Sequence, residues 1–186
     1  MRRLTVFNQV SLDGYFTDDR GDMSWAHKFD PEWTAFAAEN ASGGGVLVFG
    51  RVTYDLMASY WPTPQALQAN RVVAEAMNDL PKIVFSRSLE GRPLWKNTTL
   101  VTGDIVDAMR RLKAEAGRDM VIMGSGTIVS RFTEARLIDE YQVVVNAVVL
   151  GRGRTMFDGV TSRMGLKLKK TRTFGNGNIV LWYEPA

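Results

Sequence analysis

Short apolar runs alternate with amphipathic segments along most of the chain. Runs that fit β-strands occupy residues 4–10, 46–49, 82–85, 100–101 and 120–123. Apolar residues at helical spacing occur between them, in residues 33–40, 65–79 and 104–116. Strands that alternate with helices predict an α/β fold, in which a mostly parallel sheet carries helices on both faces.

Local signals define two element boundaries. Asp30, Pro31 and Glu32 form a helix start, because Asp is a favoured N-cap, Pro a favoured first residue and Glu a charge that suits the helix dipole. Later, residues 137–149 contain a long strand, and Gly175-Asn176-Gly177 separates two further strand-like segments, which predicts a hairpin. We therefore expect a single domain, residues 1–186, built as a three-layer α/β/α sandwich whose mostly parallel sheet is closed by a C-terminal antiparallel hairpin.

Composition excludes several classes of protein. Of the 186 residues, 45% are hydrophobic and 23% are charged, which is ordinary for a globular domain. The chain has no cysteine and therefore no disulfide or thiolate metal site. The N-terminus lacks a signal-peptide core and no apolar run reaches membrane-spanning length. We expect a cytoplasmic protein that does not contact a membrane.

Positive charge is concentrated near the C-terminus, although the net charge is only +3. In residues 166–169 leucine alternates with lysine, which is typical of an edge strand protected by its lysines. Because aromatic or groove-reading partners are lacking, we expect no contact with nucleic acid. The cations after residue 150 are Arg152, Arg154, Arg163, Lys167, Lys169, Lys170 and Arg172, against Asp158 and Glu184.

A strand, a glycine-rich turn and a helix follow one another in residues 120–131. Such a turn brings unpaired N–H groups and the positive end of a helix dipole to one place, which suits a phosphate. Gly124 and Gly126 would let the backbone approach the ligand closely. Val129 stands where the Rossmann fingerprint has its third glycine, so that motif is not matched. A plain strand-to-helix turn is the alternative interpretation.

Two more strand ends carry similar chemistry, Gly50-Arg51-Val52-Thr53 and Ser86-Arg87-Ser88. Ligands of parallel sheets bind beyond the carboxyl ends of the strands. The three ends together predict a site for a molecule with several phosphates, in which Arg51 and Arg87 bind an additional terminal phosphate. Neither motif contains the Asp or Glu that a site for an unphosphorylated ribose usually places there.

These motifs and their order resemble the dihydrofolate reductase superfamily. Within it, the chain is more similar to the reductase domain of bacterial riboflavin biosynthesis, the C-terminal part of a bifunctional deaminase-reductase, and to its stand-alone relatives. The resemblance runs nearly end to end and implies an NADPH-binding α/β sandwich around an eight-stranded mixed sheet. A twofold dimer is common for such folds, and we expect a homodimer. The motifs are Ser-Leu-Asp-Gly at 11–14, Phe-Gly-Arg-Val-Thr-Tyr at 49–54, Ser-Arg-Ser at 86–88, Met-Gly-Ser-Gly-Thr at 123–127 and Leu-Gly-Arg-Gly-Arg-Thr-Met-Phe at 150–157.

The resemblance also implies cofactor contacts, in four groups that run from the adenosine end to the nicotinamide. The adenosine side is Gly50, Arg51, Val52 and Thr53. The 2′-phosphate is flanked by Ser86, Arg87 and Ser88. The pyrophosphate is held by Gly124, Ser125, Gly126, Thr127 and Ile128. The nicotinamide lies near Asn8, Val10 and Gly14.

The candidate catalytic residues are two carboxylates. Matching Phe36 to the helix phenylalanine of dihydrofolate reductases puts Glu32 at the position of their substrate-binding carboxylate, and Asp13 precedes Gly14 in the first motif. The alternatives are a solvated glutamate at a helix start and an ordinary turn aspartate. His27, the single histidine, is interpreted as a surface residue. Dihydrofolate reductases also have a Gly-Gly pair joined by a cis peptide bond where this chain has Gly124-Ser125. Whether the Gly124–Ser125 bond is cis or trans is left open by the sequence.

The predicted activity is the NADPH-dependent transfer of hydride to a C=N or C=O carbon of a small heterocyclic or sugar-linked substrate. The most specific expectation is a pyrimidine of the 5-amino-6-(5-phosphoribosylamino)uracil type. Three alternatives stay open. They are a dihydrofolate or pterin reductase, a nucleotide-binding module without turnover, and a phosphate-sugar-binding protein that uses only the glycine turn.

Overall fold

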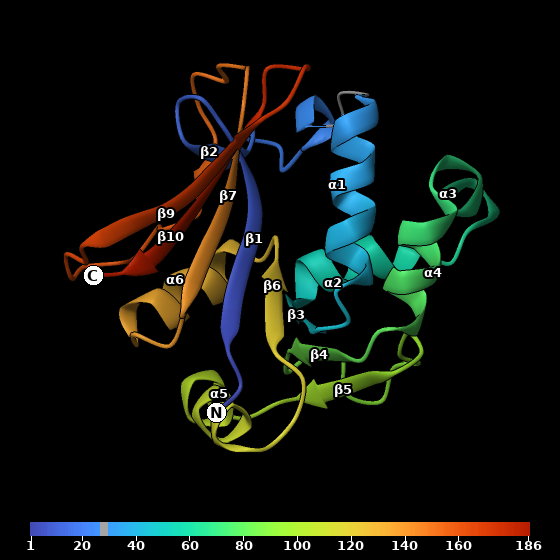
Figure 1. The fold of residues 1–186 in the computed structure, drawn as a ribbon. Coiled ribbons are helices and arrows are strands. Elements are labelled where there is room, and N and C mark those ends of the chain that lie inside the picture. Colours follow the sequence, from blue (N-terminus) through green and yellow to red (C-terminus); the bar gives the residue numbers. More distant parts are fainter. Residues whose placement is uncertain (27–29) are drawn as a thin grey trace.

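One eight-stranded sheet crosses the molecule in the order β5-β4-β3-β6-β1-β7-β10-β9 (Figure 1). The computed structural model describes residues 1–26 and 30–186. Neighbouring strands are parallel except at β10, which runs antiparallel to both β7 and β9. This confirms the predicted parallel sheet with its C-terminal hairpin. The strands are β1 (Leu4–Ser11), β3 (Val46–Gly50), β4 (Lys82–Phe85), β5 (Thr98–Val101), β6 (Met120–Met123), β7 (Glu140–Asn146), β9 (Leu166–Thr173) and β10 (Ile179–Pro185).

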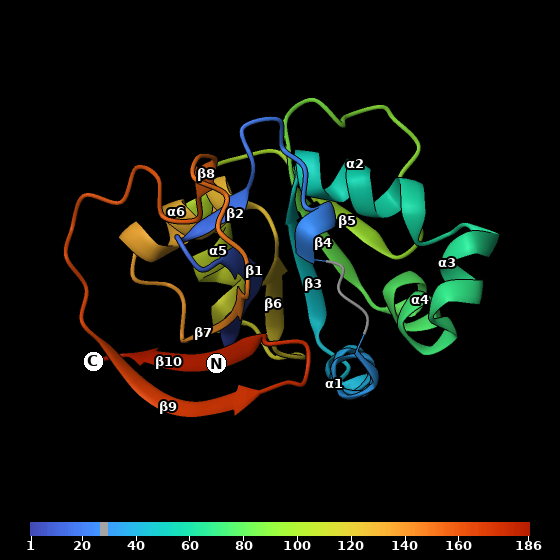
Figure 2. The ribbon, with the colours of Figure 1, turned by 90° about the horizontal axis from the view of Figure 1, so that it is seen from above.

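Helices cover both faces of this sheet, as the three-layer prediction requires (Figure 2). Residues of α5 and α6 form one large core with the sheet, and residues of α1, α2 and α4 pack on the opposite face. No helix in the described part of the chain has the length and apolar character needed to span a bilayer. The helices are α1 (Pro31–Ser42), α2 (Arg51–Tyr60), α3 (Pro64–Ala69), α4 (Arg71–Asp79), α5 (Ile105–Ala114) and α6 (Gly126–Glu134), with a short 3-10 helix η1 at Ser24–Ala26.

Strand β3 shows why the central strands read as continuous apolar runs. Val46 and Val48 are buried in the core beneath α5 and α6, and Leu47 and Phe49 are buried beneath α2 and α4. Because both faces of the strand are covered, no position is left for a polar side chain.

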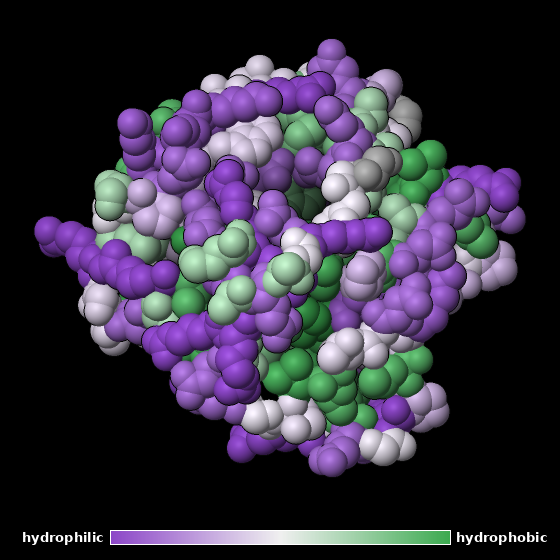
Figure 3. Space-filling view, turned by 60° about the horizontal axis from the view of Figure 1, so that its bottom comes forward, coloured by the Kyte–Doolittle hydropathy of each residue, from purple (hydrophilic) through white to green (hydrophobic). Residues whose placement is uncertain are grey.

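On the molecular surface, hydrophilic residues cover most of the face drawn in Figure 3. Hydrophobic residues gather in two places on this face, a hollow and a separate patch in the lower half of the view.

The segment 65–79 differs from its prediction as one helix. Asn70 breaks it into α3 and α4, because its backbone is extended with φ −157° and ψ 93°. The Asn70 side chain accepts a hydrogen bond from the Val73 N–H and so caps α4, while its own N–H donates to the Ala66 carbonyl and closes α3. A second two-stranded sheet, β2 (Tyr15–Thr17) with β8 (Arg154–Thr155), was not predicted either.

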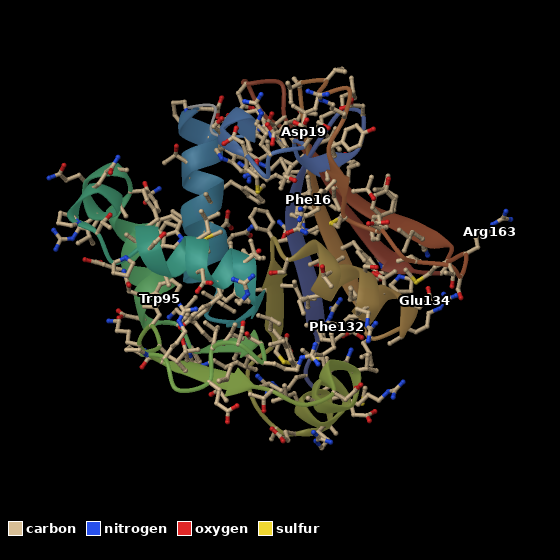
Figure 4. All side chains as sticks on the ribbon, turned by 180° about the vertical axis from the view of Figure 1, so that it is seen from behind. Phe16, Asp19, Trp95, Phe132, Glu134 and Arg163 are labelled. Atoms are coloured by element: carbon tan, nitrogen blue, oxygen red, sulfur yellow. The ribbon has the colours of Figure 1, made fainter. Side chains whose placement is uncertain are left out.

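A carboxylate clamp joins the end of α6 to the loop before β9. Glu134 accepts hydrogen bonds from the hydroxyls of Thr161 and Ser162 at 2.8 and 2.9 Å and from their N–H groups at 3.0 and 3.2 Å (Figure 4). The hydroxyl hydrogen bonds come first among the interactions that lower the pKa of Glu134 from 4.5 to about 2. The clamp therefore favours the ionised carboxylate.

We predict that Glu134 makes part of the stability of the fold sensitive to acid. Its pKa is depressed in the folded chain, so its stabilisation is complete above the ordinary value of 4.5 and is lost as the pH falls toward about 2. Glu134→Gln should lower the melting temperature at pH 7. Between pH 5 and 2.5 the melting temperature of the variant should decrease less steeply than that of the parent chain. Glu90→Gln, at an exposed position, is the control. Parallel pH profiles for the parent chain and Glu134→Gln would contradict the prediction.

Candidate functional site

The three strand ends singled out by their chemistry meet at one edge of the sheet. Strands β4, β3 and β6 are direct neighbours and run parallel. Gly50 lies opposite Phe85, so the Ser86-Arg87-Ser88 segment follows beside the start of α2. The glycine turn follows β6 on the other side of β3. The structure thus brings Gly50 into contact with Ser125, although 75 positions separate the two residues in the chain.

Hydrogen bonds connect the glycine turn to the start of α2. The Ser125 N–H donates to Thr53 Oγ1 at 2.9 Å, and the Gly50 N–H donates to Ser125 Oγ at 2.9 Å. The Ser125 hydroxyl in turn donates to the Met123 carbonyl at 3.0 Å. Since Gly50 is the N-cap of α2 and Ser125 the N-cap of α6, these bonds hold the two helix N-termini side by side.

A side chain at either glycine of the turn would meet a neighbouring side chain. A Cβ at Gly124 would lie 2.7 Å from Thr53 Cγ2, and one at Gly126 would lie 2.7 Å from Cζ of Phe16, which is labelled in Figure 4. Gly124 also has a φ of +60°, and Ser125 adopts +58°. Packing alone therefore accounts for both glycines, and the predicted close approach of a ligand stays a prediction. The Gly124–Ser125 peptide is trans.

The first turn of α6 nevertheless offers free donors. Within the described residues, the N–H groups of Gly126 and Thr127 have no acceptor. Thr127 is exposed, and so are Arg51 and Val52 in the first turn of α2. Two helix N-termini at one sheet edge combine unpaired N–H groups with two positive dipole ends, which is the chemistry of a phosphate site.

A cavity of about 620 Å³ opens beside these N-termini, at the ends of β4 and β5. Its size is within the range of roughly 300–1,000 Å³ usual for small-molecule sites. Apolar side chains and polar groups both line it, so it can hold a flat apolar ring together with a charged group. The apolar lining is Phe85, Val101, Ile105 and Ile128, and the polar lining includes Ser86, Arg87, Thr102, Asp104, Thr127 and Arg131.

The second arginine of this cavity is Arg131, not the predicted Arg51. Arg51 forms an ion pair with Asp55 one turn further along α2, at 3.2 Å, and does not line the cavity. Arg131 lies one turn after Thr127 on α6 and lines the cavity with Arg87. Its spacing of four residues from Thr127 is the sequence signal that could have found it.

Asp104 brings a carboxylate to the same cavity, but its Oδ1 atom already caps a helix. Hydrogen bonds from the N–H groups of Asp107 and Val106 lower the pKa of Asp104, and the nearby charge of Arg131 adds to the effect. Asp104 therefore acts as the N-cap of α5. Among the other predicted contacts, Ser88 donates its N–H to Ser86 Oγ and lies outside the cavity lining.

At the end of β1, Asn8 carries an unsatisfied buried oxygen. Its Nδ2 donates to the Gly124 carbonyl at 2.9 Å and to Met156 Sδ at 3.1 Å. Its Oδ1 is buried without a hydrogen-bond partner in the described part of the chain. Val10 is buried on the same strand, and Gly14 forms an exposed turn with φ +88°. A buried acceptor without a donor costs free energy, which a ligand N–H would recover.

Asp13 holds a loop in place, which argues against its predicted role as a catalytic acid. Its carboxylate accepts hydrogen bonds from the N–H groups of Leu150 and Gly151, the latter at 2.7 Å. A side-chain hydrogen bond with Ser11 and these backbone bonds lower the pKa of Asp13 to about 2. A carboxylate engaged by these N–H groups fixes the loop and is not free to face a substrate.

Glu32 lies exposed in the first turn of α1. Asp30, not Glu32, caps this helix, by accepting from the Trp33 N–H at 2.7 Å. Phe36, one turn later, is buried among the aromatic side chains that hold α1 on the sheet. The structure does not bring Glu32 into contact with the other predicted site residues. His27 lies outside the described residues.

Buried carboxamides on the α1 face of the sheet were missed by the sequence analysis. Asn146 Nδ2 donates to Gln9 Oε1 at 3.3 Å, and Asn178 Nδ2 donates to Asn146 Oδ1 at 2.9 Å. The Oδ1 atom of Asn178 is buried without a partner among the described residues. These side chains come from β1, β7 and the hairpin turn, so no local motif could reveal them.

The profile of the RibD C-terminal domain matches residues 2–180. The chain belongs to this family. It is 27% identical over 185 residues to the uncharacterized protein YyaP of Bacillus subtilis strain 168, and the match covers 98% of this chain and 95% of YyaP. A Shewanella sp. PV-4 protein named as a putative riboflavin biosynthesis protein is 25% identical, with a TM-score of 0.74 and 99% coverage of both chains.

The dihydrofolate reductase of Enterococcus faecalis, solved in complex with NADP(H), shares the fold. Its TM-score is 0.66 at 14% sequence identity, and the match covers 98% of this chain and 96% of that enzyme. Together with the family match, this confirms the predicted relationship to the RibD reductase domain and the dihydrofolate-reductase-like α/β fold.

The packing of Gly124 against Thr53 can be tested by stability. Gly124→Ala should destabilise the fold by about 1–3 kcal/mol, because it combines a left-handed backbone with a clash. Thr53→Ser removes the methyl group that the new Cβ would meet. In that background the cost of Gly124→Ala should fall by at least about 0.5 kcal/mol, measured by urea unfolding.

The matched control is Gly91→Ala, where φ is +76° and nothing lies within 4 Å of the new Cβ. This variant carries the backbone cost without the clash. If Gly124→Ala were no worse than Gly91→Ala, or gained nothing from Thr53→Ser, the contact would not be the reason for the glycine.

Proposed function

We propose that this chain is an NADPH-dependent reductase that acts on a small heterocycle of the pyrimidine type. The observation that carries the proposal is the cavity with Arg87 and Arg131, which adjoins the free N–H groups of α6. The family match to the RibD C-terminal domain supports a reductase, and the fold shared with an enzyme that binds NADP(H) supports the cofactor.

The residues present fit NADPH along its whole length. Arg87, Arg131 and the Ser86 hydroxyl suit the adenosine 2′-phosphate, with an apolar surface beside them for the adenine. The N–H groups of Gly126 and Thr127 suit the pyrophosphate. The unpartnered Asn8 Oδ1 suits an N–H donor such as the nicotinamide carboxamide. The nucleotide would thus follow the sheet edge from β5 to β1.

When bound, NADPH supplies a hydride, and the protein contributes position and surroundings. Asn8 would orient the nicotinamide at the end of β1. Phe16, packed over Gly126, would shield the same edge from water. Glu32 is the proposed proton donor for the reduced atom, from its place at the start of α1.

Carboxamides favour a pyrimidine over a pterin. A uracil-type ring presents alternating C=O and N–H groups, and the unpartnered Oδ1 of Asn178 could accept from such an N–H group. A pterin amidine edge instead calls for a buried carboxylate, and Glu32 is exposed. A Thermotoga maritima protein of the same fold is named as a 5-amino-6-(5-phosphoribosylamino)uracil reductase, which supports a substrate of that type.

A second candidate is a nucleotide-binding module without turnover. The placement of the two predicted catalytic acids favours it. Asp13 accepts a hydrogen bond from the N–H of Gly151 in a loop, and Glu32 is exposed to solvent. Stoichiometric NADPH binding without oxidation across a panel of pyrimidines, pterins and quinones would support it. The predicted homodimer is compatible with both candidates.

Nucleotide preference tests the cofactor site. Charge-assisted hydrogen bonds contribute roughly 1.5–3 kcal/mol each, so NADPH should bind at least about tenfold tighter than NADH. Arg87→Ala and Arg131→Ala should each weaken NADPH about tenfold and leave NADH nearly unchanged, as measured by calorimetric titration. Added salt should narrow the preference by screening.

Arg51→Ala is the matched control, because Arg51 is paired with Asp55 outside the cavity. It should preserve the affinity for both nucleotides. Equal affinity of the parent chain for NADPH and NADH, or a larger effect at Arg51 than at Arg131, would place the site elsewhere.

Glu32→Gln tests the proposed proton donor. Cofactor affinity should be unchanged, while turnover of an accepted substrate should fall by about 10²-fold, as for a lost general acid. Glu39→Gln, an exposed glutamate later on α1, is the control. Full turnover in Glu32→Gln would leave this residue as a helix-end charge only.

A further inference from the structure

The motif at residues 150–157 brings a methionine sulfur to the end of β1. Met156 of this motif is only 3% exposed and belongs to the core on the α5 and α6 face of the sheet. Its Sδ atom accepts a hydrogen bond from Asn8 Nδ2 at 3.1 Å. The contact joins residues that are 148 positions apart in the chain, and the cavity with Arg87 gives no reason for it.

This contact leaves Asn8 with acceptor chemistry only. A carboxamide has two N–H hydrogens, and Nδ2 of Asn8 has two acceptors, the Gly124 carbonyl at 2.9 Å and Met156 Sδ. Turning the amide over would put Oδ1 against the Gly124 carbonyl oxygen, so that two acceptors would face each other. The atom left for a ligand is therefore Oδ1, which is buried and has no donor in residues 1–26 or 30–186.

The two acceptors restrict different motions of the Asn8 side chain. The Gly124 carbonyl determines which end of the amide faces the glycine turn. The sulfur restricts rotation of the amide plane about the Cβ–Cγ bond, a torsion that is broad in asparagine. Without the sulfur, one N–H would be buried without a partner, and rotation of the plane would relieve that cost. Met156 thus sets the direction of Oδ1.

The small second sheet holds Met156 in place. Strand β8 ends directly before Met156 and pairs with β2. Gly153, which precedes β8, has no room for a side chain, because a Cβ there would collide with the Thr17 carbonyl oxygen. The carboxylate of Asp13 holds the start of the same motif through backbone N–H groups. The segment that carries the sulfur is therefore fixed on both sides of β8.

We propose that Met156 is a positioning residue for the nicotinamide. By fixing the amide of Asn8, it makes Oδ1 the partner of the carboxamide N–H of the cofactor and so selects for that group. The inference rests on the proposed function, which puts the nicotinamide at the end of β1. It goes further by naming the residue that acts through Asn8 and the cofactor group that the two residues recognise.

The test compares NADP⁺ with its 3-acetylpyridine analogue, which carries a methyl group in place of the carboxamide NH₂. The two nucleotides have the same charge and phosphates, so the ratio of their affinities reports on this group. In calorimetric titration the parent chain should bind NADP⁺ about tenfold tighter, because the analogue leaves a buried acceptor unpaired. Met156→Leu, which conserves volume, should reduce the ratio to about twofold or less. Met156→Gln, which returns an acceptor atom, should restore part of it.

Met109→Leu is the matched control. Met109 is buried in the same core, and no donor to its sulfur occurs among the described residues. This variant should keep the ratio of the parent chain. An unchanged ratio in Met156→Leu, or an equal loss in Met109→Leu, would overturn the positioning role. An equal loss in Met156→Leu and Met156→Gln would also overturn it, since shape and not the acceptor would then be responsible.

Adenosine 2′,5′-bisphosphate separates this inference from the proposed function, because it carries the adenosine end of NADPH without the nicotinamide. Met156→Leu should bind it as tightly as the parent chain does. A loss as large as that for NADP⁺ would show general damage to the site and would contradict the positioning role. If the parent chain binds neither nucleotide, the proposed function fails and this inference fails with it. Binding of both without a preference for the carboxamide refutes only the role of Met156.

Discussion

The arrangement of the candidate site depends on the hydrogen bonds between Ser125 and the start of α2. Through them, Thr53 and Gly50 hold the glycine turn against the neighbouring strand end. Ser125 adopts a left-handed backbone to make these contacts, and Gly124 beside it has no room for a side chain. As a result, the N-termini of α2 and α6 stay next to each other. The free donors that a phosphate needs then lie at one place on the sheet edge.

Much of the fold follows from sequence pattern, because the pattern reflects burial. The apolar run of β3 is buried on both faces, and the Gly175-Asn176-Gly177 turn joins β9 to β10, as predicted. The structural features that the sequence did not predict depend on single side chains or on contacts between residues far apart in the chain. Asn70 ends α3 and begins α4, and no Gly or Pro at this position signals the break in the sequence. The pairing of β2 with β8 joins segments that are about 140 residues apart and has no local signal.

The sequence predicted which strand ends meet at the candidate site, but not which of their side chains face the cavity. Parallel strands put Gly50, Ser86 and Gly124 at one edge whatever their order, so these ends could be found from motifs. Which arginine faces the cavity depends on its partners. Arg51 forms an ion pair with Asp55 on α2 and does not line the cavity, whereas Arg131 from the second turn of α6 does. Likewise Asp13 is near the expected position, but backbone N–H groups from a later loop occupy its carboxylate.

We propose that NADPH lies along the sheet edge from the Arg87 cavity to Asn8. A crystal structure of the chain grown with NADPH tests it most directly. We expect the 2′-phosphate within hydrogen-bond distance of Arg87 and Arg131, the pyrophosphate on the N–H groups of Gly126 and Thr127, and a donor on Asn8 Oδ1. A nucleotide bound elsewhere, or one that leaves the cavity and the α6 N-terminus unoccupied, would contradict it.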